Sequence, residues 1–302
     1  MSLRVNPDTV PDLVAAIEQA QQNEQTAAQQ MATGRSVNNL SDNPAAAAQL
    51  VNNNALTGEN DQFLTNVTDL QSKFQAADSA LNSAVQLMTT AISVGTEGAN
   101  GTLSAADRQA VAQQVQGIQQ QMLALANTEY EGTYIFSGTN VTTPAFAQDS
   151  TAASGVQYNG NTDVTSVQIS EGQSMQTNVA GSQIFTNANG NIFQALNDLA
   201  NALTSGNGID AANTEVQQAF SQLTTQRVFY GNALNQVQTS QNFLNQEQVN
   251  LSTQQNQLVG ANMTQAITNE SQAQTDEEAA LSATGQILSL PTLLSYITGT
   301  AK

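Results

Sequence analysis

The 302-residue chain contains no cysteine, no histidine and no tryptophan. The absence of cysteine and histidine excludes disulfides, Cys/His zinc sites, and catalytic arrangements of the Ser-His-Asp or Cys-His kind. Carboxylates could still act as acid and base, but the acidic cluster Asp276–Glu278 is a run of consecutive residues, which a helix points in different directions. No phosphate-binding, dinucleotide-binding or calcium-binding motif is found either. The sequence therefore predicts no catalytic residues, no cofactor, no metal and a protein that is not an enzyme.

Positive charge is also scarce, because six basic residues stand against 24 acidic ones and give a net charge of -18. The bases are scattered, so we expect no nucleic-acid partner and no attraction to an anionic membrane surface. No run approaches the ~18 apolar residues of a membrane span. The first 20 residues lack the apolar stretch of a cleavable signal. The expectation is no membrane insertion and, if the protein is exported, export without a cleavable signal.

Over two long stretches of the chain, mainly apolar residues recur every three or four positions, a spacing that is typical of coiled coils. An N-terminal stripe follows this spacing at Leu56, Asn60, Phe63, Val67, Leu70, Phe74, Ala77, Leu81, Ala84, Met88 and Ala91. A C-terminal stripe follows it at Val216, Phe220, Leu223, Arg227, Tyr230, Leu234, Val237, Gln241, Leu244, Gln248, Leu251, Gln255 and Leu258. Neither stripe can be buried by its own helix, so each needs a partner.

Capping residues, proline and glycine predict where these helices begin and end. Asn43 before Pro44 predicts a helix start, and Gly95, Gly98 and Gly101 predict its end near residue 94. A capping box at 104–107 predicts a further helix to about residue 130. Four to six short strands are expected within 137–190, followed by helices from 192, over about 214–258 and over about 262–289.

The predicted fold is therefore mainly α: an elongated antiparallel coiled-coil or helical-bundle rod with a small inserted β-rich tip. We expect three domains. Residues 1–43 with 260–302 form terminal helical arms, residues 44–136 with 191–259 form the rod, and residues 137–190 form the tip.

Several apolar positions exceed what the chain can cover by itself. In the C-terminal stripe Leu251 and Leu258 alternate with glutamines, so this seam either obtains partners from neighbouring copies or stays partly wet. The apolar positions of the last forty residues exceed what the first helix could cover, so the two ends are expected to order on joining other copies. The predicted assembly interface comprises Val10, Val14, Ile17, Arg35, Asp42, Asn43, Leu251, Leu258, Leu281, Leu288, Leu290, Leu293, Leu294, Tyr296 and Ile297.

The stretch from Met31 to Ala46, with Arg35 directly after Gly34 and the Ser-Asp-Asn-Pro run at 41–44, resembles the N-terminal signature of the flagellin family. Residues 215–297 resemble the matching C-terminal arm with its leucine-rich tail. Within the family, Gly132–Thr139 and Arg227–Leu234 resemble segments of the subunits that join hook to filament.

This resemblance implies a flagellin-like fold and a structural subunit of the bacterial flagellum at the hook–filament junction, outside the cell. It implies self-association in a ring or helical layer and export by the flagellar type III system. The partners it implies are the junction protein on the hook side, flagellin on the filament side, and a cytosolic export chaperone for the C-terminal arm.

Two other functions are compatible with the sequence. A filament flagellin would share both arms. A secreted glycan-binding adhesin would instead use its tip, where the aromatic residues Phe136, Phe146, Tyr158 and Phe185 could serve either as a binding surface or as a core.

Overall fold

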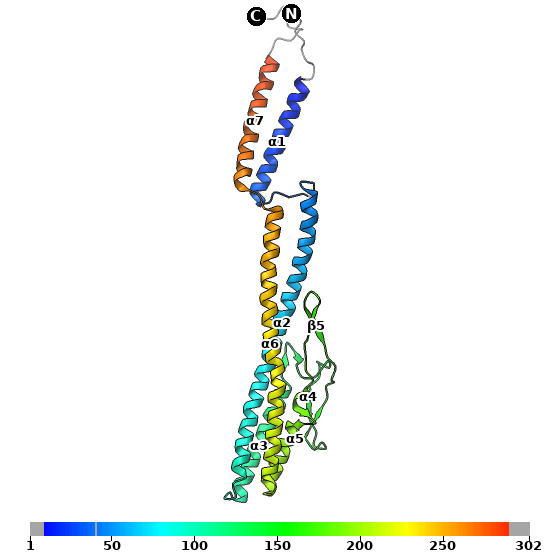
Figure 1. Ribbon diagram of the computed structural model, residues 1–302, viewed down its shortest axis with the longest axis vertical. Helices are drawn as coiled ribbons and strands as arrows, with labels where there is room; N and C mark the ends of the chain where they lie inside the picture. Colours follow the sequence, from blue (N-terminus) through cyan, green and yellow to red (C-terminus); the bar gives the residue numbers. More distant parts are fainter. Residues whose placement is uncertain (1–8, 40, 290–302) are drawn as a thin grey trace, which may run out of the picture. The chain divides into compact units, whose positions relative to one another are not determined.

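The computed structural model describes residues 9–39 and 41–289. The chain divides into two compact units (Figure 1). Unit 1 is formed by residues 1–58 and 248–302, and unit 2 by residues 59–247. The described helices are α1 (Thr9–Thr33), α2 (Pro44–Gly98), α3 (Ala105–Ala126), α4 (Gly181–Phe185), α5 (Ile192–Ser205), α6 (Ile209–Val259) and α7 (Met263–Ser289). The prediction of a mainly α protein is confirmed.

Unit 1 contains two antiparallel helix pairs. Helices α1 and α7 run side by side, although their sequences lie at opposite ends of the chain (Figure 1). The first turns of α2 and the last turns of α6 form the second pair, which meets around Leu251, buried at 2% exposure.

Unit 2 holds the main apolar core, which the rest of α2 and α6 share with α3, α5 and the β segments. Its helical part buries the predicted N-terminal stripe from Phe63 to Ala91 and the C-terminal stripe at Val216, Leu223, Tyr230, Val237 and Leu244. Leu56, which the sequence placed at the start of the first stripe, is instead 42% exposed. These long helices are polar on most of their surface, and they pair because each buries an apolar stripe on a heptad spacing against the others.

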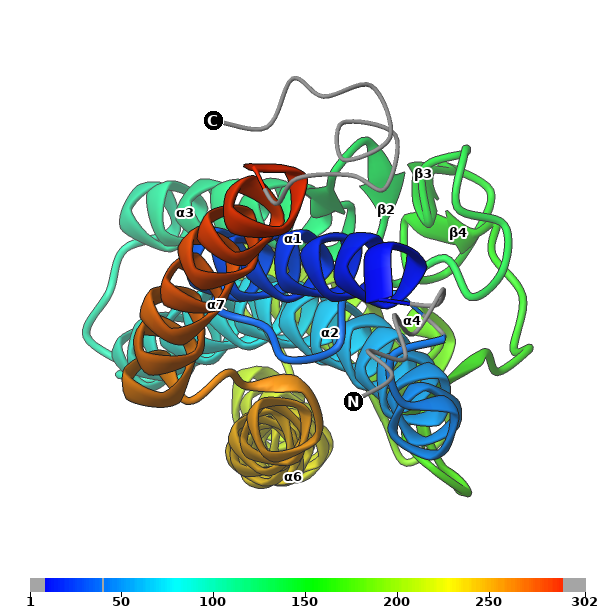
Figure 2. The same ribbon diagram turned by 90° about the horizontal axis from the view of Figure 1, so that it is seen from above.

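The strands in residues 9–39 and 41–289 form four separate antiparallel pairs rather than one sheet. Figure 2, which views α6 nearly end-on, shows the β segments as a lobe beside the helices. The pairs are β1 (Glu129–Tyr130) with β2 (Thr133–Tyr134), β3 (Phe146–Gln148) with β4 (Val156–Tyr158), β5 (Ser166–Ser170) with β6 (Gln173–Gln176), and β7 (Thr186–Asn187) with β8 (Gly190–Asn191). Two-stranded ribbons are marginal alone, so their packing on helices and on one another must stabilise them.

The end of α2 was predicted near residue 94 from Gly95, Gly98 and Gly101, and the helix ends four residues later, at Gly98. A Cβ on Gly95 would lie 2.5 Å from Oδ1 of Asn213, and one on Gly98 would overlap the side chain of Leu203. Both glycines are buried. They are needed for close approach of neighbouring helices, a requirement that the local sequence does not reveal.

The predicted caps of α2 and α3 are confirmed. The Ser104 hydroxyl accepts the N–H of Asp107 at 3.2 Å, and the Asp107 carboxylate accepts the N–H of Ser104 at 3.3 Å, which completes the predicted capping box of α3. Asn43 caps α2 by accepting the N–H of Ala46 at 3.1 Å. The predicted division into three domains remains a prediction.

Candidate assembly surfaces

Small residues form the seam of the α1–α7 pair. Ala20 and Ala27 on α1, and Ala266 and Ala273 on α7, are each no more than 5% exposed and repeat every seven residues. Alanines at seam positions let two helices approach closely, but each removes far less apolar surface from water than a leucine does. The pair is therefore held together by little apolar burial.

The predicted stripe of α1 coincides with this seam only in part, because Ile17 lies three residues before Ala20 on the buried side and Val14 lies outside it. Val14 is 47% exposed, Ile17 is half-buried, and Leu281 on α7 is 53% exposed. Val10 and Leu288 belong to the helices, but their side chains are outside the described set. Leu290, Leu293, Leu294, Tyr296 and Ile297 lie outside the described residues altogether.

Exposed large apolar side chains concentrate in unit 1. Of ten such residues in the described part of the chain, seven belong to this smaller unit: Val14, Val51, Leu56, Val249, Met263, Ile267 and Leu281. Its interior is built mainly from alanine, so the usual arrangement of large apolar residues inside is partly inverted. This concentration of exposed apolar side chains makes unit 1 the candidate surface for protein–protein contacts.

The two connections that lead into the α1–α7 pair are hydrogen-bonded to each other. Ser36 donates its N–H to the carbonyl of Val259 at 2.7 Å, and Ala261 donates to the carbonyl of Gly34 at 2.9 Å. Arg35 and Gly260 thereby form an antiparallel bridge. Arg35, predicted as an interface residue, leaves its side chain exposed, and its backbone position is what joins the two connections.

Beneath this bridge Val37, Ala46 and Val259 form a small buried cluster, against which the half-buried Leu258 packs. Gly34 ends α1 in the left-handed conformation, with φ of 66°. The cluster and the bridge hold the C-terminal end of α1 close to the N-terminal end of α7.

Asp42 organises the loop between α1 and α2. Its carboxylate accepts the N–H groups of Asn39 at 2.8 Å and Asn38 at 2.9 Å. These two backbone donors hold the pKa of Asp42 below its ordinary value. The sequence singled out Asp42 and Asn43 as interface residues, and the structure gives both of them a role in the loop and helix start.

Acid is expected to loosen this loop. Because the folded pKa of Asp42 is lowered, its contribution is present above the ordinary value of about 3.9 and is lost as the pH falls through the lowered value. In an NMR titration the amide resonances of Asn38 and Asn39 should move together, with a midpoint below 3.9. The Asp42→Asn variant should show no such step, and a midpoint at or above the ordinary value would contradict the assignment.

Two buried asparagines of α2 supply polar contacts to α6, in addition to the predicted Gln255, which donates to Oδ1 of Asn54 at 3.1 Å. Within unit 1, Asn53 donates to the carbonyl of Leu251 at 3.2 Å. Within unit 2, Asn60, one heptad later, donates to the carbonyl of Leu244 at 3.2 Å. Sequence reasoning placed Asn60 in the stripe but missed its partner, and a polar residue at such a position specifies register.

The two segments that resembled junction subunits meet in unit 2. The rings of Phe136 and Tyr230 are 6.4 Å apart at 89°, and Tyr230 also packs edge-on against Phe74 at 5.8 Å. Arg227 binds Asp78 through two hydrogen bonds of 2.8 and 3.2 Å. These contacts join the segment 132–139 to α2 and α6.

Aromatic residues of the predicted tip form a core rather than a surface. Phe136, Phe146 and Phe185 are at most 1% exposed, and Phe146 stacks at 5.3 Å on Phe193 of α5. The half-buried Tyr158 donates its hydroxyl to the carbonyl of Asn161 at 2.8 Å. Nothing in this arrangement favours the glycan-binding alternative.

No helix among the described residues is long and apolar enough to cross a membrane. Within the same part of the chain, no group of three His, Cys, Asp or Glu side chains converges as a metal ion would require.

Comparison with known proteins points to one family. The model of the bacterial flagellin N-terminal helical region matches residues 12–141. The model of the flagellin C-terminal helical region matches residues 213–297. Together these ranges cover more than half of the chain.

Individual proteins agree with these matches. The chain is 34% identical to flagellar hook-associated protein 3 of Salmonella typhimurium over 164 residues, which is 54% of this chain and half of that protein. It is 28% identical to the protein of the same name from Escherichia coli over 241 residues, covering 70% of this chain and 73% of the other.

The fold is shared with the flagellar junction protein FlgL of Legionella pneumophila. The TM-score is 0.60 at 14% identity, over 70% of this chain and all of that one. The two family matches, at the ends where the structure pairs α1 with α7 and α2 with α6, show that the chain belongs to the bacterial flagellin family.

Proposed function

We propose that this protein is a non-enzymatic structural subunit of the flagellum that joins the hook to the filament. The observation that carries the proposal is the incomplete burial of unit 1, whose α1–α7 pair hides alanines and exposes Val14, Ile267 and Leu281. Such a unit is covered only when neighbouring molecules pack on it. The similarity to flagellar hook-associated proteins supports a position at the junction of hook and filament.

The resemblance to the flagellin family suggests the finer parts of the proposed function. Copies self-associate in a ring or helical layer through the terminal arms, residues 1–43 and 260–302. The hook side of the layer contacts another junction protein, and the filament side contacts flagellin. The chain reaches the cell exterior through the flagellar type III system, and a cytosolic chaperone holds the C-terminal arm beforehand.

Growth on seeds tests the proposal against the alternative of a filament flagellin, which the two family matches equally favour. Purified protein is added alone to flagellar fragments, and the added length is measured by electron microscopy. A junction subunit should bind at fragment ends and stop after a short layer. Long filaments would instead identify a flagellin, and absence of any binding would contradict both.

A further inference from the structure

The β5–β6 hairpin of unit 2, labelled at β5 in Figure 1, has two outer edges. Opposite residues of an antiparallel pair alternate between bonding to each other and pointing their backbone N–H and C=O groups outward. Thr177 donates its N–H to the carbonyl of Thr165 at 2.8 Å, so these two residues form a bonded pair. By this alternation, the backbone groups of Ser174 and Gln176 point outward from β6.

The outer edge of β5 is partly blocked. Its outward backbone groups belong to Ser166 and Gln168. Asn66 of α2 donates to the carbonyl of Gln168 at 2.8 Å, which occupies one of these groups. The register also shifts between Gln168 and Ser170, and irregularities of this kind protect an edge from further pairing.

The outer edge of β6 is open. In the part of the chain that the structure describes, no other segment hydrogen-bonds to the outward backbone groups of Ser174 and Gln176. Unpaired N–H and C=O groups in a row are a template for another strand. The open edge lies beside a groove of about 210 Å³ between β6 and α6, which the same two residues help to line.

The groove combines an apolar lining with neutral polar side chains. Met175 and Ala233 are buried and Phe229 is half-buried, whereas Asn232 and Gln236 are exposed. An apolar side chain of a bound segment can therefore be covered here, and two amides are available for hydrogen bonds.

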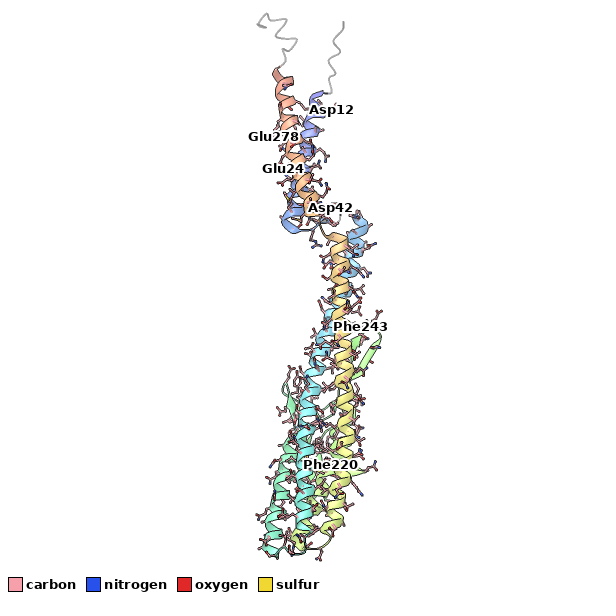
Figure 3. All side chains as sticks on the ribbon, turned by 60° about the vertical axis from the view of Figure 1, so that its left-hand side comes forward. Asp12, Glu24, Asp42, Phe220, Phe243 and Glu278 are labelled. Atoms are coloured by element: carbon pink, nitrogen blue, oxygen red, sulfur yellow. The ribbon has the colours of Figure 1, made fainter. Side chains whose placement is uncertain are left out.

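An exposed aromatic side chain continues this face of α6. Phe243 follows Gln236 by seven residues, so the two share a face of the helix. Phe243, labelled in Figure 3, is 60% exposed. Seven helical residues rise about 10 Å, a distance that about three residues of extended chain also span. A strand of ordinary length along β6 can therefore reach Phe243.

We infer that the β6 edge and the groove bind an extended peptide segment of another protein, which adds a third strand to the hairpin. Recognition of this kind takes its affinity from main-chain hydrogen bonds and its specificity from pockets for alternate side chains. The site lies in unit 2, so the inference goes beyond the proposed function, which rests on unit 1.

Charge limits which segment can bind. None of the residues that line the groove is charged, so a charged side chain placed there would lose its hydration without a partner. Glu171 in the hairpin turn and Glu247 one turn after Phe243 are acidic, and the chain has a net charge of -18. Acidic segments, and a second copy of this acidic chain, are therefore disfavoured. The segment should carry apolar side chains at alternate positions, and basic residues only at its ends.

A displayed library of random octapeptides, selected on the full-length chain, is the probe. Bound peptides should be enriched in alternating apolar residues and depleted in acidic residues and in proline, which lacks an N–H donor. The most enriched octapeptide is then synthesised with a fluorophore, and its Kd is measured by fluorescence anisotropy.

Two matched proline variants test the edge. Ser174→Pro removes an outward N–H from β6, and Ser166→Pro removes one from β5; both serines are exposed. Proline is tolerated at edge positions whose N–H faces solvent. The Kd of the octapeptide should rise at least about tenfold for Ser174→Pro and stay within about threefold of wild type for Ser166→Pro. Equal effects of the two substitutions would overturn the choice of edge.

A second pair of variants tests the groove without altering the hairpin backbone. Gln236→Trp fills the groove, whereas Gln238 is exposed and lies two residues later, roughly 200° around the helix. Gln236→Trp should weaken octapeptide binding at least about tenfold, and Gln238→Trp should leave it within about threefold of wild type. Circular dichroism of each free variant, expected to match wild type, separates lost binding from altered folding.

Amide hydrogen exchange locates the added strand. A saturating octapeptide should slow exchange at Ser174 and Gln176 by at least about tenfold, and leave Met175 unchanged because its N–H already points toward β5. Protection at Ser166 and Gln168 instead would overturn the inference, as would a library in which no peptide distinguishes wild type from Gln236→Trp. Flagellar fragments take no part in these measurements, so either failure would leave the proposed function intact.

Discussion

A chain truncated after Ala261 should lose binding to flagellar fragments while keeping unit 2 folded. The truncation removes α7, and with it Ala266 and Ala273, the partners of the alanine seam on α1. Most of the stability of a helix in a protein comes from packing against its partner, so α1 should lose helical structure as well. Binding should fall by on the order of a hundredfold or more, which corresponds to about 2.8 kcal/mol.

Two optical signals separate the parts of this effect. Tyr130, Tyr134, Tyr158 and Tyr230 all belong to unit 2, so the near-ultraviolet circular dichroism of tyrosine should persist in the truncated chain. The far-ultraviolet helical signal should fall by the fraction of helical residues that α1 and α7 contribute. Fragment binding at the wild-type level would exclude the terminal arms from the assembly surface.

Tyr230→Ala should be the most damaging single substitution in unit 2. The side chain is 1% exposed, and its ring contacts those of Phe74, Phe136 and Phe229 at centroid distances of 5.8, 6.4 and 5.2 Å. Removing a buried aromatic ring leaves a cavity and costs about 3–5 kcal/mol. Urea unfolding followed by far-ultraviolet circular dichroism measures the loss.

Two controls on the same helix bracket this value. Tyr230→Phe keeps the ring and should change the free energy of unfolding by less than about 1.5 kcal/mol. Phe243→Ala removes an aromatic ring of similar size that is 60% exposed, labelled in Figure 3, and should stay within about 0.5 kcal/mol of wild type. A Tyr230→Ala cost no larger than that of Phe243→Ala would mean that the segment 132–139, which contains Phe136, does not depend on α6.

The helices and their caps could be predicted because their signals are local. The period of Phe63 to Ala91, the capping box at Ser104 and the cap at Asn43 each depend on residues within a few positions of one another. The strands β3 to β7 lie within the predicted range 137–190, where turns and alternation mark them, whereas β1 and β2 precede it and β8 ends at Asn191. Their arrangement in separate two-stranded pairs was not predicted, because pairing depends on distant packing.

The assembly surface could be predicted only in part. The stripe through Val14 and Ile17 was recognised as apolar, but the sequence could not show that α1 meets α7 along Ala20 and Ala27 and leaves Val14 exposed. Choosing between two stripes on one helix depends on the shape of the partner. The same limit applies to Asn53 and Asn60, whose acceptors lie almost two hundred residues away.

The sequence by itself determined that this is a helical, strongly acidic chain without thiol or imidazole chemistry, because composition and local periodicity are properties of the chain alone. Only the tertiary structure decided which apolar residues remain outside, why Gly95 sits within a helix, and that Gln21 of α1 meets Glu277 of α7. The physical reason is that burial belongs to pairs of surfaces: a residue is covered only when another segment has the shape and chemistry to cover it.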